Sequence, residues 1–288
     1  MLDGNTNQNA DQVDYWNGEV GQRWARDADR LDAAFRPLTE ALVQHAAVRP
    51  NERVMDVGCG CGELTGLLAE QAGPGGAVLA VDVSRPMLEH ARARTPTEGA
   101  APITWRQADA AALPCAKAGY DVLASRFGVM FFADPLAAFR HLRLSLRPGG
   151  RLAMLCWRPA AENGWVAVPR AAMLRVVPAP PPVPPLAPGP FAFADAAHTG
   201  AMLARAGFTG VTSLAVNARL QVLSTPDGTP LEDAVRFVTE CGPAAGLVRD
   251  ADEALRERAL DAVRSAMAGP DEPGLGAACW LYSAVNPG

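Results

Sequence analysis

The sequence predicts a doubly wound α/β fold, in which helices cover both faces of a largely parallel sheet. Residues 53–57 form a short apolar, β-branched run typical of a strand, and three glycines at every second position follow it. Leucines at helical spacing come next, so strand, glycine turn and helix make the first half of a mononucleotide-binding βαβ unit. A near-continuous apolar run at residues 77–82 predicts a second strand, buried on both faces.

Length and composition limit the kinds of protein that the chain can be. Its 288 residues, 49% hydrophobic and 20% charged, suffice for one large α/β domain with insertions or for two small domains. The net charge of −5 argues against nucleic acid as a partner, and six scattered cysteines argue against a disulfide framework or a metal site. No apolar run is long enough to span a bilayer and no leader opens the chain, so we expect a cytoplasmic protein.

The glycine turn has the spacing G-x-G-x-G, formed by Gly58, Gly60 and Gly62. The dinucleotide fingerprint places its third glycine one residue later. Together with Asp56 at the end of the strand, the turn resembles motif I of the class I S-adenosylmethionine-dependent methyltransferases. The resemblance implies that Asp56, the three glycines and Cys59 line the methionine and ribose parts of the cofactor.

Asp82, at the end of the second strand, can accept hydrogen bonds from both hydroxyls of a ribose. This chemistry serves NAD and S-adenosylmethionine equally. Ser84 suits the N-cap of the helix that follows, with Pro86 in its first turn, so the Asp82 carboxylate is left for a ligand. The resemblance adds Val83 and Met87 to the cofactor site, with Met87 near the adenine.

Residues 103–107 predict a third strand, and Asp109 follows it between Ala108 and Ala110. The pattern resembles the adenine-recognition motif of the same methyltransferases. The resemblance implies that Asp109 accepts a hydrogen bond from the adenine amino group, with Ala108 alongside and the Ala110 N–H facing the ring. Taken alone, an aspartate at this position is more often a turn residue.

The fourth strand, residues 120–125, continues into Ser-Arg-Phe-Gly-Val-Met-Phe-Phe-Ala-Asp-Pro at residues 125–135. This run resembles the fourth motif of the UbiE-like methyltransferases. The resemblance implies that Arg126 and Phe127 border the sulfonium of the cofactor. His141 falls opposite the apolar stripe of the following helix, so we expect a surface residue and not a base.

Residues 1–12 are polar and are expected to be disordered. Tyr15, Trp16 and Trp24 follow close together, and they suit an anchor onto the core and a lid over the cofactor equally well. The segment resembles the N-terminal part of the UbiE-like methyltransferases, which implies that Tyr15 and Trp24 contact the cofactor.

The later chain breaks the strand–helix alternation twice, with a proline-rich stretch and with a long, mainly helical stretch before the last strand. The resemblance implies a seven-stranded Rossmann-like sheet of order 3-2-1-4-5-7-6, with the last strand antiparallel and with helical cap insertions. The predicted segments are an N-terminal arm or lid at residues 1–30, a cofactor-binding core at 31–157, a Pro-rich cap insertion at 158–192, further core at 193–224, a helical cap insertion at 225–276 and the final core strand at 277–288.

The resemblance implies a methyltransferase that uses S-adenosylmethionine and releases S-adenosylhomocysteine. The enlarged, apolar cap suggests a small hydrophobic or aromatic acceptor, such as a secondary metabolite or a quinol, methylated in line on oxygen, nitrogen or carbon. No general base can be assigned; the candidates are His198, His45 and Tyr15, followed by Cys115. The lack of a clear His-Asp pair suits an acceptor that is already nucleophilic.

Two alternatives stay open. An NAD-dependent oxidoreductase shares the βαβ start, but Glu63 occupies the position of its third glycine. A protein that binds S-adenosylmethionine without methyl transfer, either a cyclase or isomerase or a binding subunit, keeps the same glycine turn, because fold and cofactor site do not determine the reaction. The expected partner is a small molecule, without nucleic acid or a membrane span, and the sequence leaves monomer and homodimer open.

Overall fold

The centre of the molecule is a seven-stranded sheet with the order β3-β2-β1-β4-β5-β7-β6. The structure, a computed structural model, describes residues 9–94, 96–114, 118–182, 184, 186–249, 251–269 and 275–288. Strands β1 to β5 pair in parallel, whereas β7 runs antiparallel to both β5 and β6. The predicted fold class, strand order and antiparallel last strand are confirmed.

The strands of the sheet are short at one edge and long at the other. They are β1 Arg53–Val57, β2 Ala77–Asp82, β3 Ile103–Gln107, β4 Tyr120–Arg126, β5 Leu146–Trp157, β6 Thr209–Arg219 and β7 Gly276–Val285. The α-helices are α1 Ala10–Asn17, α2 Glu19–Arg26, α3 Ala28–Ala46, α4 Glu63–Ala72, α5 Arg85–Ala93, α6 Pro135–Ser145, α7 Gly164–Met173, α8 Ala196–Arg205, α9 Pro230–Glu240 and α10 Glu253–Met267. Short 3-10 helices are η1 Gly128–Phe131, η2 Ala160–Glu162 and η3 Pro243–Val248.

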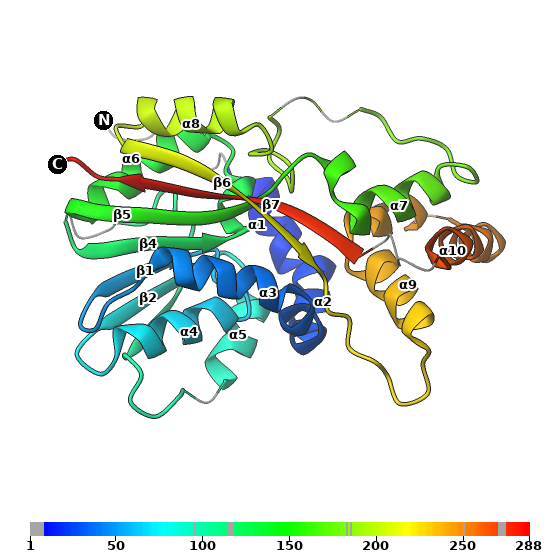
Figure 1. The fold of residues 1–288 in the computed structure, drawn as a ribbon, viewed down its shortest axis with the longest axis horizontal. Coiled ribbons are helices and arrows are strands. Elements are labelled where there is room, and N and C mark those ends of the chain that lie inside the picture. Colours follow the sequence, from blue (N-terminus) through cyan, green and yellow to red (C-terminus); the bar gives the residue numbers. More distant parts are fainter. Residues whose placement is uncertain are drawn as a thin grey trace.

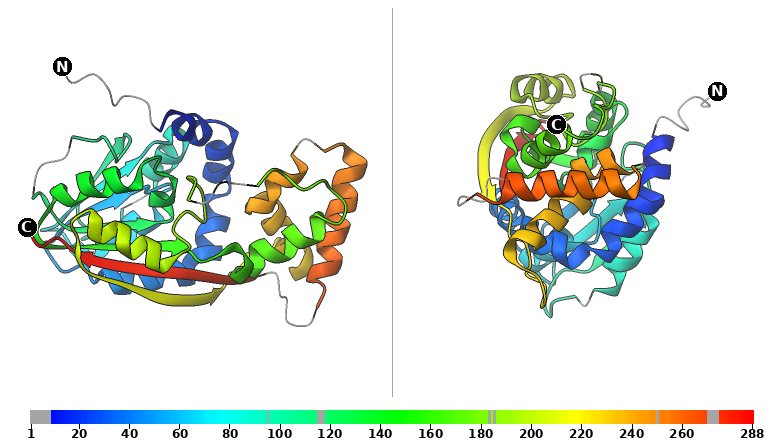
Figure 2. Two further views of the ribbon diagram at one scale, coloured as in Figure 1. Left: turned by 90° about the horizontal axis from the view of Figure 1, so that it is seen from above. Right: turned by 90° about the vertical axis from the view of Figure 1, so that its right-hand side faces the viewer.

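Helices cover both faces of the sheet (Figure 1). Helices α3, α4 and α5 lie on one face, and α6 and α8 lie on the other (Figures 1 and 2). Helix α3 turns a buried stripe of Leu31, Phe35, Leu38 and Leu42 toward the strands. Because both faces are covered, the middle of each central strand is buried and mostly apolar, and β4 buries its residues from Val122 to Ser125.

The helices of the two predicted insertions form one cap at the carboxyl ends of the parallel strands (Figures 1 and 2). Helix α7 comes from the first insertion, α9 and α10 come from the second, and all three pack against one another. Their buried apolar residues, among them Val166, Phe237 and Val263, belong to the same core as the sheet. The cap is therefore continuous with the core, although two separate chain segments build it.

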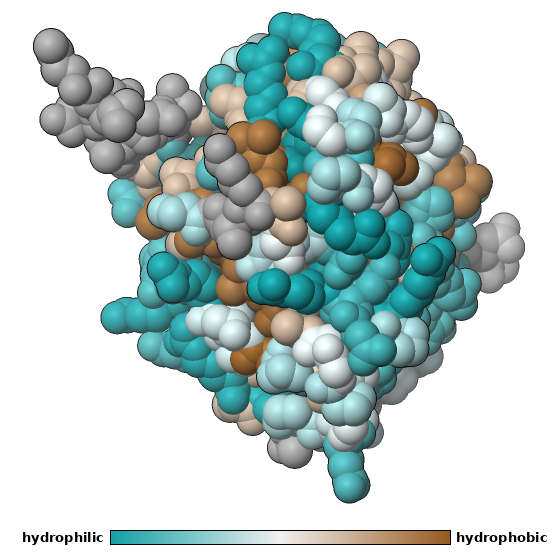
Figure 3. All heavy atoms as spheres, turned by 90° about the vertical axis from the view of Figure 1, so that its left-hand side faces the viewer, coloured by the Kyte–Doolittle hydropathy of each residue, from teal (hydrophilic) through white to brown (hydrophobic). Residues whose placement is uncertain are grey.

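The face at the opposite end of the sheet from the cap is mainly hydrophilic, and its apolar residues are scattered in small groups (Figure 3). Within the described part of the chain, no helix has the length and apolar character needed to cross a bilayer.

The structure differs from the predicted elements mainly at their ends. Ala10, Asp11 and Gln12 lie in α1, so the prediction of disorder is wrong for them; residues 1–8 of that segment lie outside the described residues. Strand β6 pairs with β7 from Thr209 to Arg219, whereas β5 pairs with β7 from Arg151 and begins at Leu146 through pairing with Tyr120 of β4. This pairing is long-range and leaves no local signal.

The backbones after β1 and β4 approach closely at Gly58 and Gly128. A Cβ atom on Gly128 would lie 2.6 Å from the Gly58 Cα and 2.6 Å from the Val57 carbonyl oxygen. Strand β1 lies between β2 and β4, at the point where the strand order reverses. Ligands of doubly wound sheets bind in the crevice at this point, outside the carboxyl ends of the strands.

Gly128→Ala is expected to destabilise the protein by about 2 kcal/mol, because the added methyl group meets backbone atoms that cannot rotate away. Urea unfolding measures this change. The matched control is Gly66→Ala inside α4, where nothing lies within 4 Å of the added Cβ. This substitution should stabilise by about 0.5–1 kcal/mol through the higher helix propensity of alanine. Equal stability of the Gly128 variant and the wild type would contradict the close contact.

Candidate functional site

A cavity of about 430 Å³ opens at the carboxyl ends of β1, β2 and β4, within the size range of small-molecule sites. The arm helices α1 and α2 form one wall and parts of the cap form another. Of the residues predicted to bind a cofactor, these line the cavity: Tyr15, Trp24, Asp56, Gly58, Cys59, Gly60, Asp82, Val83, Met87, Ala108, Asp109, Ala110, Arg126 and Phe127.

Gly62 is the predicted residue that does not line the cavity. It adopts a φ of +87°, and a Cβ atom there would lie 2.8 Å from the Trp105 ring and 3.1 Å from the Ala91 side chain. Gly62 therefore lets the start of α4 pack against β3 and α5. The spacing identified it as a turn glycine but could not show which side of the turn it faces.

Hydrogen bonds hold the first half of the glycine turn to the end of β2. The N–H groups of Gly58 and Cys59 both donate to the Val81 carbonyl, at 2.8 and 3.1 Å. The Gly60 N–H donates to Asp82 Oδ2 at 2.8 Å. These donors are therefore occupied, and the turn is a rigid floor whose position is set by β2.

Asp82 uses its carboxylate to join two loops. Its Oδ1 accepts from the Ser84 N–H at 2.8 Å, and its Oδ2 accepts from Gly60. Burial raises the pKa of Asp82, while these backbone hydrogen bonds oppose the rise. Each carboxylate oxygen keeps a further lone pair for a ligand hydroxyl. The N-cap of α5 is Ser84, as predicted, since its hydroxyl accepts from the Met87 N–H.

Asp56 carries an acceptor atom without a partner. The residue is fully buried, and its Oδ2 accepts from the Thr65 hydroxyl at 2.6 Å. Its Oδ1 is also buried and has no hydrogen-bond partner. Burial raises the pKa of Asp56 to about 7, against the opposing hydrogen bond from Thr65 and the positive charge of Arg126. A cationic group of a ligand in the cavity would satisfy this oxygen.

Asp109 is a turn residue, and it also faces the cavity. Its Oδ1 accepts from the Ala111 N–H at 2.9 Å, which is the local bond expected of an aspartate in a turn. Its Oδ2 accepts from the side-chain amide of Asn9 at 2.7 Å. Contact with an adenine amino group stays a prediction.

Arg126 is bound within a cluster of charged side chains at the cavity wall. It pairs with Glu63 and lies 3.6 Å from Asp32 Oδ1, and it donates to the Thr39 hydroxyl at 2.5 Å. Asp32 also pairs with Arg94. The cluster joins β4 to α3, α4 and the end of α5, so the first role of Arg126 is to hold these elements together.

Phe127 adopts a left-handed backbone conformation, with φ of +66°, which is strained for a residue with a Cβ atom. Its ring stacks on Trp157 at 4.1 Å between ring centroids, with 7° between the ring planes. This stacking, together with the turn into η1, offsets the strain and directs the ring into the cavity. Contact of Phe127 and Arg126 with a sulfonium stays a prediction.

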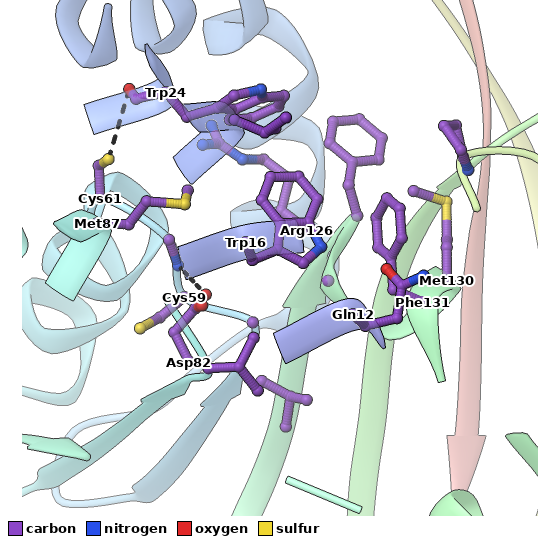
Figure 4. Close-up of a pocket in the computed structure, with 18 of the residues that line it drawn as sticks. Gln12, Trp16, Trp24, Cys59, Cys61, Asp82, Met87, Arg126, Met130 and Phe131 are labelled. Carbon is purple, nitrogen blue, oxygen red and sulfur yellow. Dashed lines mark hydrogen bonds between the residues drawn. The ribbon is translucent and has the colours of Figure 1, made fainter. Parts of the chain in front are cut away.

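The N-terminal arm is both an anchor and a wall of the cavity. The Asn17 side-chain amide donates to the Val83 carbonyl at 2.9 Å, and its Oδ1 accepts from the Arg85 N–H at 3.0 Å. The Ser84 hydroxyl donates to the Trp16 carbonyl at 2.7 Å. Trp16 then lies in the middle of the cavity wall, edge-on to both Trp24 and Phe131 (Figure 4).

An aromatic chamber, which the sequence analysis did not identify, forms the cap side of the cavity. Phe35, Trp157 and Trp165 pack with edge-on or tilted rings at 5.0–5.9 Å between centroids. The cap adds residues 188–190 and 241–243 to the lining. Trp157 and Trp165 stand on either side of residue 158, where the Pro-rich cap insertion was predicted to begin. Two tryptophans so close to this boundary could have indicated the chamber from the sequence.

The candidates for a general base are mostly outside the cavity. The residues of α3 that line the cavity lie between Ala28 and Phe35, whereas His45 is in the last turn of this helix. His198 is exposed on α8, and neither histidine lines the cavity. Tyr15 does line it, and Cys115 lies outside the described residues. His141 is half-buried instead of exposed, since its Nε2 lies 2.7 Å from the Leu113 carbonyl oxygen.

Comparison with known proteins assigns part of the chain to a family. Residues 54–150 match the methyltransferase domain family. Nocamycin O-methyltransferase of Saccharothrix syringae is 34% identical over 121 residues, which are 42% of this chain and 43% of that protein. Demethylmenaquinone methyltransferase of Thermus thermophilus is 35% identical over 136 residues, which are 47% of this chain and 61% of that protein. The chain thus spans about half the length of the curated relatives it matches.

Solved structures share the fold over most of the chain. The YcgJ protein of a Bacillus superposes with a TM-score of 0.55 at 14% identity. The aligned region is 87% of this chain and 98% of the YcgJ chain. The [4+2]-cyclase SpnF has a TM-score of 0.53 at 16% identity, covering 93% of this chain and 96% of its own. At these identities the likeness shows the fold alone.

Asp56→Asn is expected to change how stability depends on pH. The folded-state pKa of about 7 lies above the ordinary value of 3.8, so ionisation of Asp56 favours unfolding as pH rises between these values. Asparagine does not ionise. Between pH 5 and pH 8 the variant should therefore gain on the order of 2 kcal/mol in unfolding free energy relative to the wild type. Denaturant titrations at both pH values measure the difference.

The control for this measurement is Asp134→Asn, at the exposed N-cap of α6. Asparagine caps a helix about as well as aspartate. The difference in unfolding free energy between the Asp134 variant and the wild type should therefore stay nearly constant between pH 5 and pH 8. A constant difference for the Asp56 variant as well would show that Asp56 titrates normally.

Proposed function

Since residues 54–150 match the methyltransferase domain family, we propose that the protein is a class I, S-adenosylmethionine-dependent methyltransferase of the UbiE-like type that methylates a small aromatic or otherwise hydrophobic molecule. The methyl group would pass in line to an oxygen, nitrogen or carbon of the acceptor. The match to a methyltransferase domain and the antiparallel β7 both count against an NAD-dependent oxidoreductase.

The observation that carries this proposal is that one cavity joins two chemically different halves. The ends of β1 and β2 and the turn after β3 supply the carboxylates of Asp56, Asp82 and Asp109. The cap and α3 supply an aromatic chamber around Trp157 and Trp165. The polar half suits a nucleoside cofactor and the apolar half suits a hydrophobic acceptor. Because the two halves belong to one cavity, the cofactor and the acceptor can come into contact.

The residues of the polar half fit S-adenosylmethionine. The unpartnered Oδ1 of Asp56 suits the ammonium of its methionine part, and the free lone pairs of Asp82 suit its ribose hydroxyls. Asp109 and Ala110 line the same half of the cavity, and under this proposal they bind the adenine. When bound, this cofactor supplies an activated methyl group, so orientation by the chain provides much of the rate.

The acceptor is proposed to react without a strong base from the protein. Among the described residues, neither a histidine nor a lysine lines the cavity. Tyr15 is the one predicted candidate there, and it is partly exposed at the rim. A phenol of low pKa, an enol, a carboxylate or an amine meets this condition. The names of the two relatives, a nocamycin and a demethylmenaquinone methyltransferase, agree with small-molecule acceptors of this kind.

The experiment that tests the proposal follows S-adenosylhomocysteine formation with a panel of hydroquinones, phenols, enols and aryl carboxylates. Acceptor-dependent product, with a methylated compound of matching mass, is the expected outcome. Conversion of an acceptor without S-adenosylhomocysteine would favour a cyclase or isomerase that only binds the cofactor. Binding of NAD in place of S-adenosylmethionine would exclude the proposal.

Asp82→Ala is expected to weaken S-adenosylhomocysteine binding by about 10- to 100-fold, because it removes ribose acceptors and frees the Gly60 loop. Calorimetric titration measures the affinity. His141→Ala is the control, since His141 bonds to the Leu113 carbonyl outside the cavity and its loss should leave affinity unchanged. Wild-type affinity in the Asp82 variant would refute the ribose assignment.

A further inference from the structure

Two arginines line the cavity, and they differ in their partners. Arg126 is held by Glu63, Asp32 and Thr39. Arg23, on α2, forms no ion pair and no side-chain hydrogen bond with any of the described residues, and its Nε is buried without a partner. A buried guanidinium N–H that lacks an acceptor is unfavourable, so its natural partner is a ligand.

Among the described residues, four carboxylates line the cavity, and none of them forms an ion pair with Arg23. Asp56 accepts from Thr65 and keeps its other oxygen unpartnered, but that oxygen is not hydrogen-bonded to Arg23. Asp32 is paired with Arg94 and Arg126, and Asp82 accepts from backbone N–H groups. Asp109 accepts from Asn9 and Ala111. The positive charge of Arg23 therefore has no counter-ion within the described part of the cavity wall.

Arg23 lies where the arm helix α2 meets the end of the cap helix α9. Burial raises the pKa of Cys241 to about 11, and the nearby charge of Arg23 opposes that rise. Residues 241–243, at the end of α9, line the cavity together with Arg23. Nearby, Arg30 on α3 forms an ion pair with Glu240 at the end of α9, at 3.3 Å. The guanidinium is thus beside the cap half of the cavity.

We propose that Arg23 binds a carboxylate of a molecule held in the cavity. The planar fork of a guanidinium matches a carboxylate through two parallel hydrogen bonds. The acceptor and the methionine part of the cofactor can each supply this group, and the position beside the cap favours the acceptor. The inference rests on the proposed function, and it narrows the acceptor to an aromatic acid.

Two other buried polar atoms of the cavity wall support a polar ligand at this end. The Trp165 Nε1 in the aromatic chamber and the Gln12 Oε1 on α1 have no partners. Gln12 lies beside Phe131 (Figure 4). The Trp165 N–H can donate to an oxygen of a planar acid, whereas the Gln12 oxygen requires a donor on the ligand, such as a hydroxyl.

The test compares charge recognition in Arg23→Gln, Arg23→Lys and the control Arg26→Gln. Arg26 is on the same helix and is largely exposed, so its variant makes the same charge change outside the cavity. The probes are S-adenosylhomocysteine and 5′-methylthioadenosine, which lacks the amino-acid part. They are followed by 2-naphthoate and its neutral analogue 2-naphthamide, both on protein saturated with S-adenosylhomocysteine.

The wild type and the Arg26 variant should bind 2-naphthoate about tenfold more tightly than 2-naphthamide. Arg23→Gln should lose this preference, and Arg23→Lys should restore part of it, since lysine keeps the charge without the fork. S-adenosylhomocysteine affinity should not change. A tenfold loss confined to S-adenosylhomocysteine, with 5′-methylthioadenosine unaffected, would also support a carboxylate site and assign it to the cofactor.

Two outcomes would overturn the inference. One is that Arg23→Gln changes neither S-adenosylhomocysteine affinity nor the relative affinity of the naphthalene probes, including the case in which neither probe binds. The other is a parallel loss of 5′-methylthioadenosine binding, which would make Arg23 a structural residue of the arm. Failure of the wild type to bind either nucleoside would instead count against the proposed function.

Discussion

The contact between the backbones at Gly58 and Gly128 is the constraint on which the site depends. A side chain at either position would push apart the turns that follow β1 and β4. Their contact brings the glycine turn next to the end of β4, where Arg126 and Phe127 begin the second wall. The cavity therefore lies where the strand order reverses, with ligand-facing groups from both directions of the sheet.

The charges around this contact are arranged so that most of them cancel within the protein. Arg126, Glu63 and Asp32 form a cluster at the cavity wall that joins α3 and α4 to β4. Since these groups satisfy one another, they offer little to a ligand. Among the described charged residues that line the cavity, Asp56 and Arg23 each keep a buried side-chain atom without a hydrogen-bond partner, and the two groups differ in sign. A buried group without a partner is unfavourable in the free protein, which makes these two the positions where ligand charge has most effect.

The remaining walls come from segments that are remote in sequence. The arm is fixed to the loops after β2 and β3 through Asn17 and Asn9, and the Asn9 side chain also accepts from the Ala133 N–H. The cap is joined to the first turn of α3, next to the arm, by the Arg30–Glu240 ion pair. This closed arrangement shields the cavity from water on two sides.

The sequence alone determined the features that depend on local backbone geometry. The glycine turn, the carboxylates at Asp56 and Asp82, and the Ser84 cap all follow from spacing within a few residues, and the strand order followed from the family resemblance. Only the tertiary structure decided that Gly62 faces Trp105 and that Arg126 is bound to Glu63. It also decided that two distant insertions build one aromatic chamber. Local periodicity encodes strands and helices, whereas side-chain partners depend on packing between segments that no short stretch of sequence specifies.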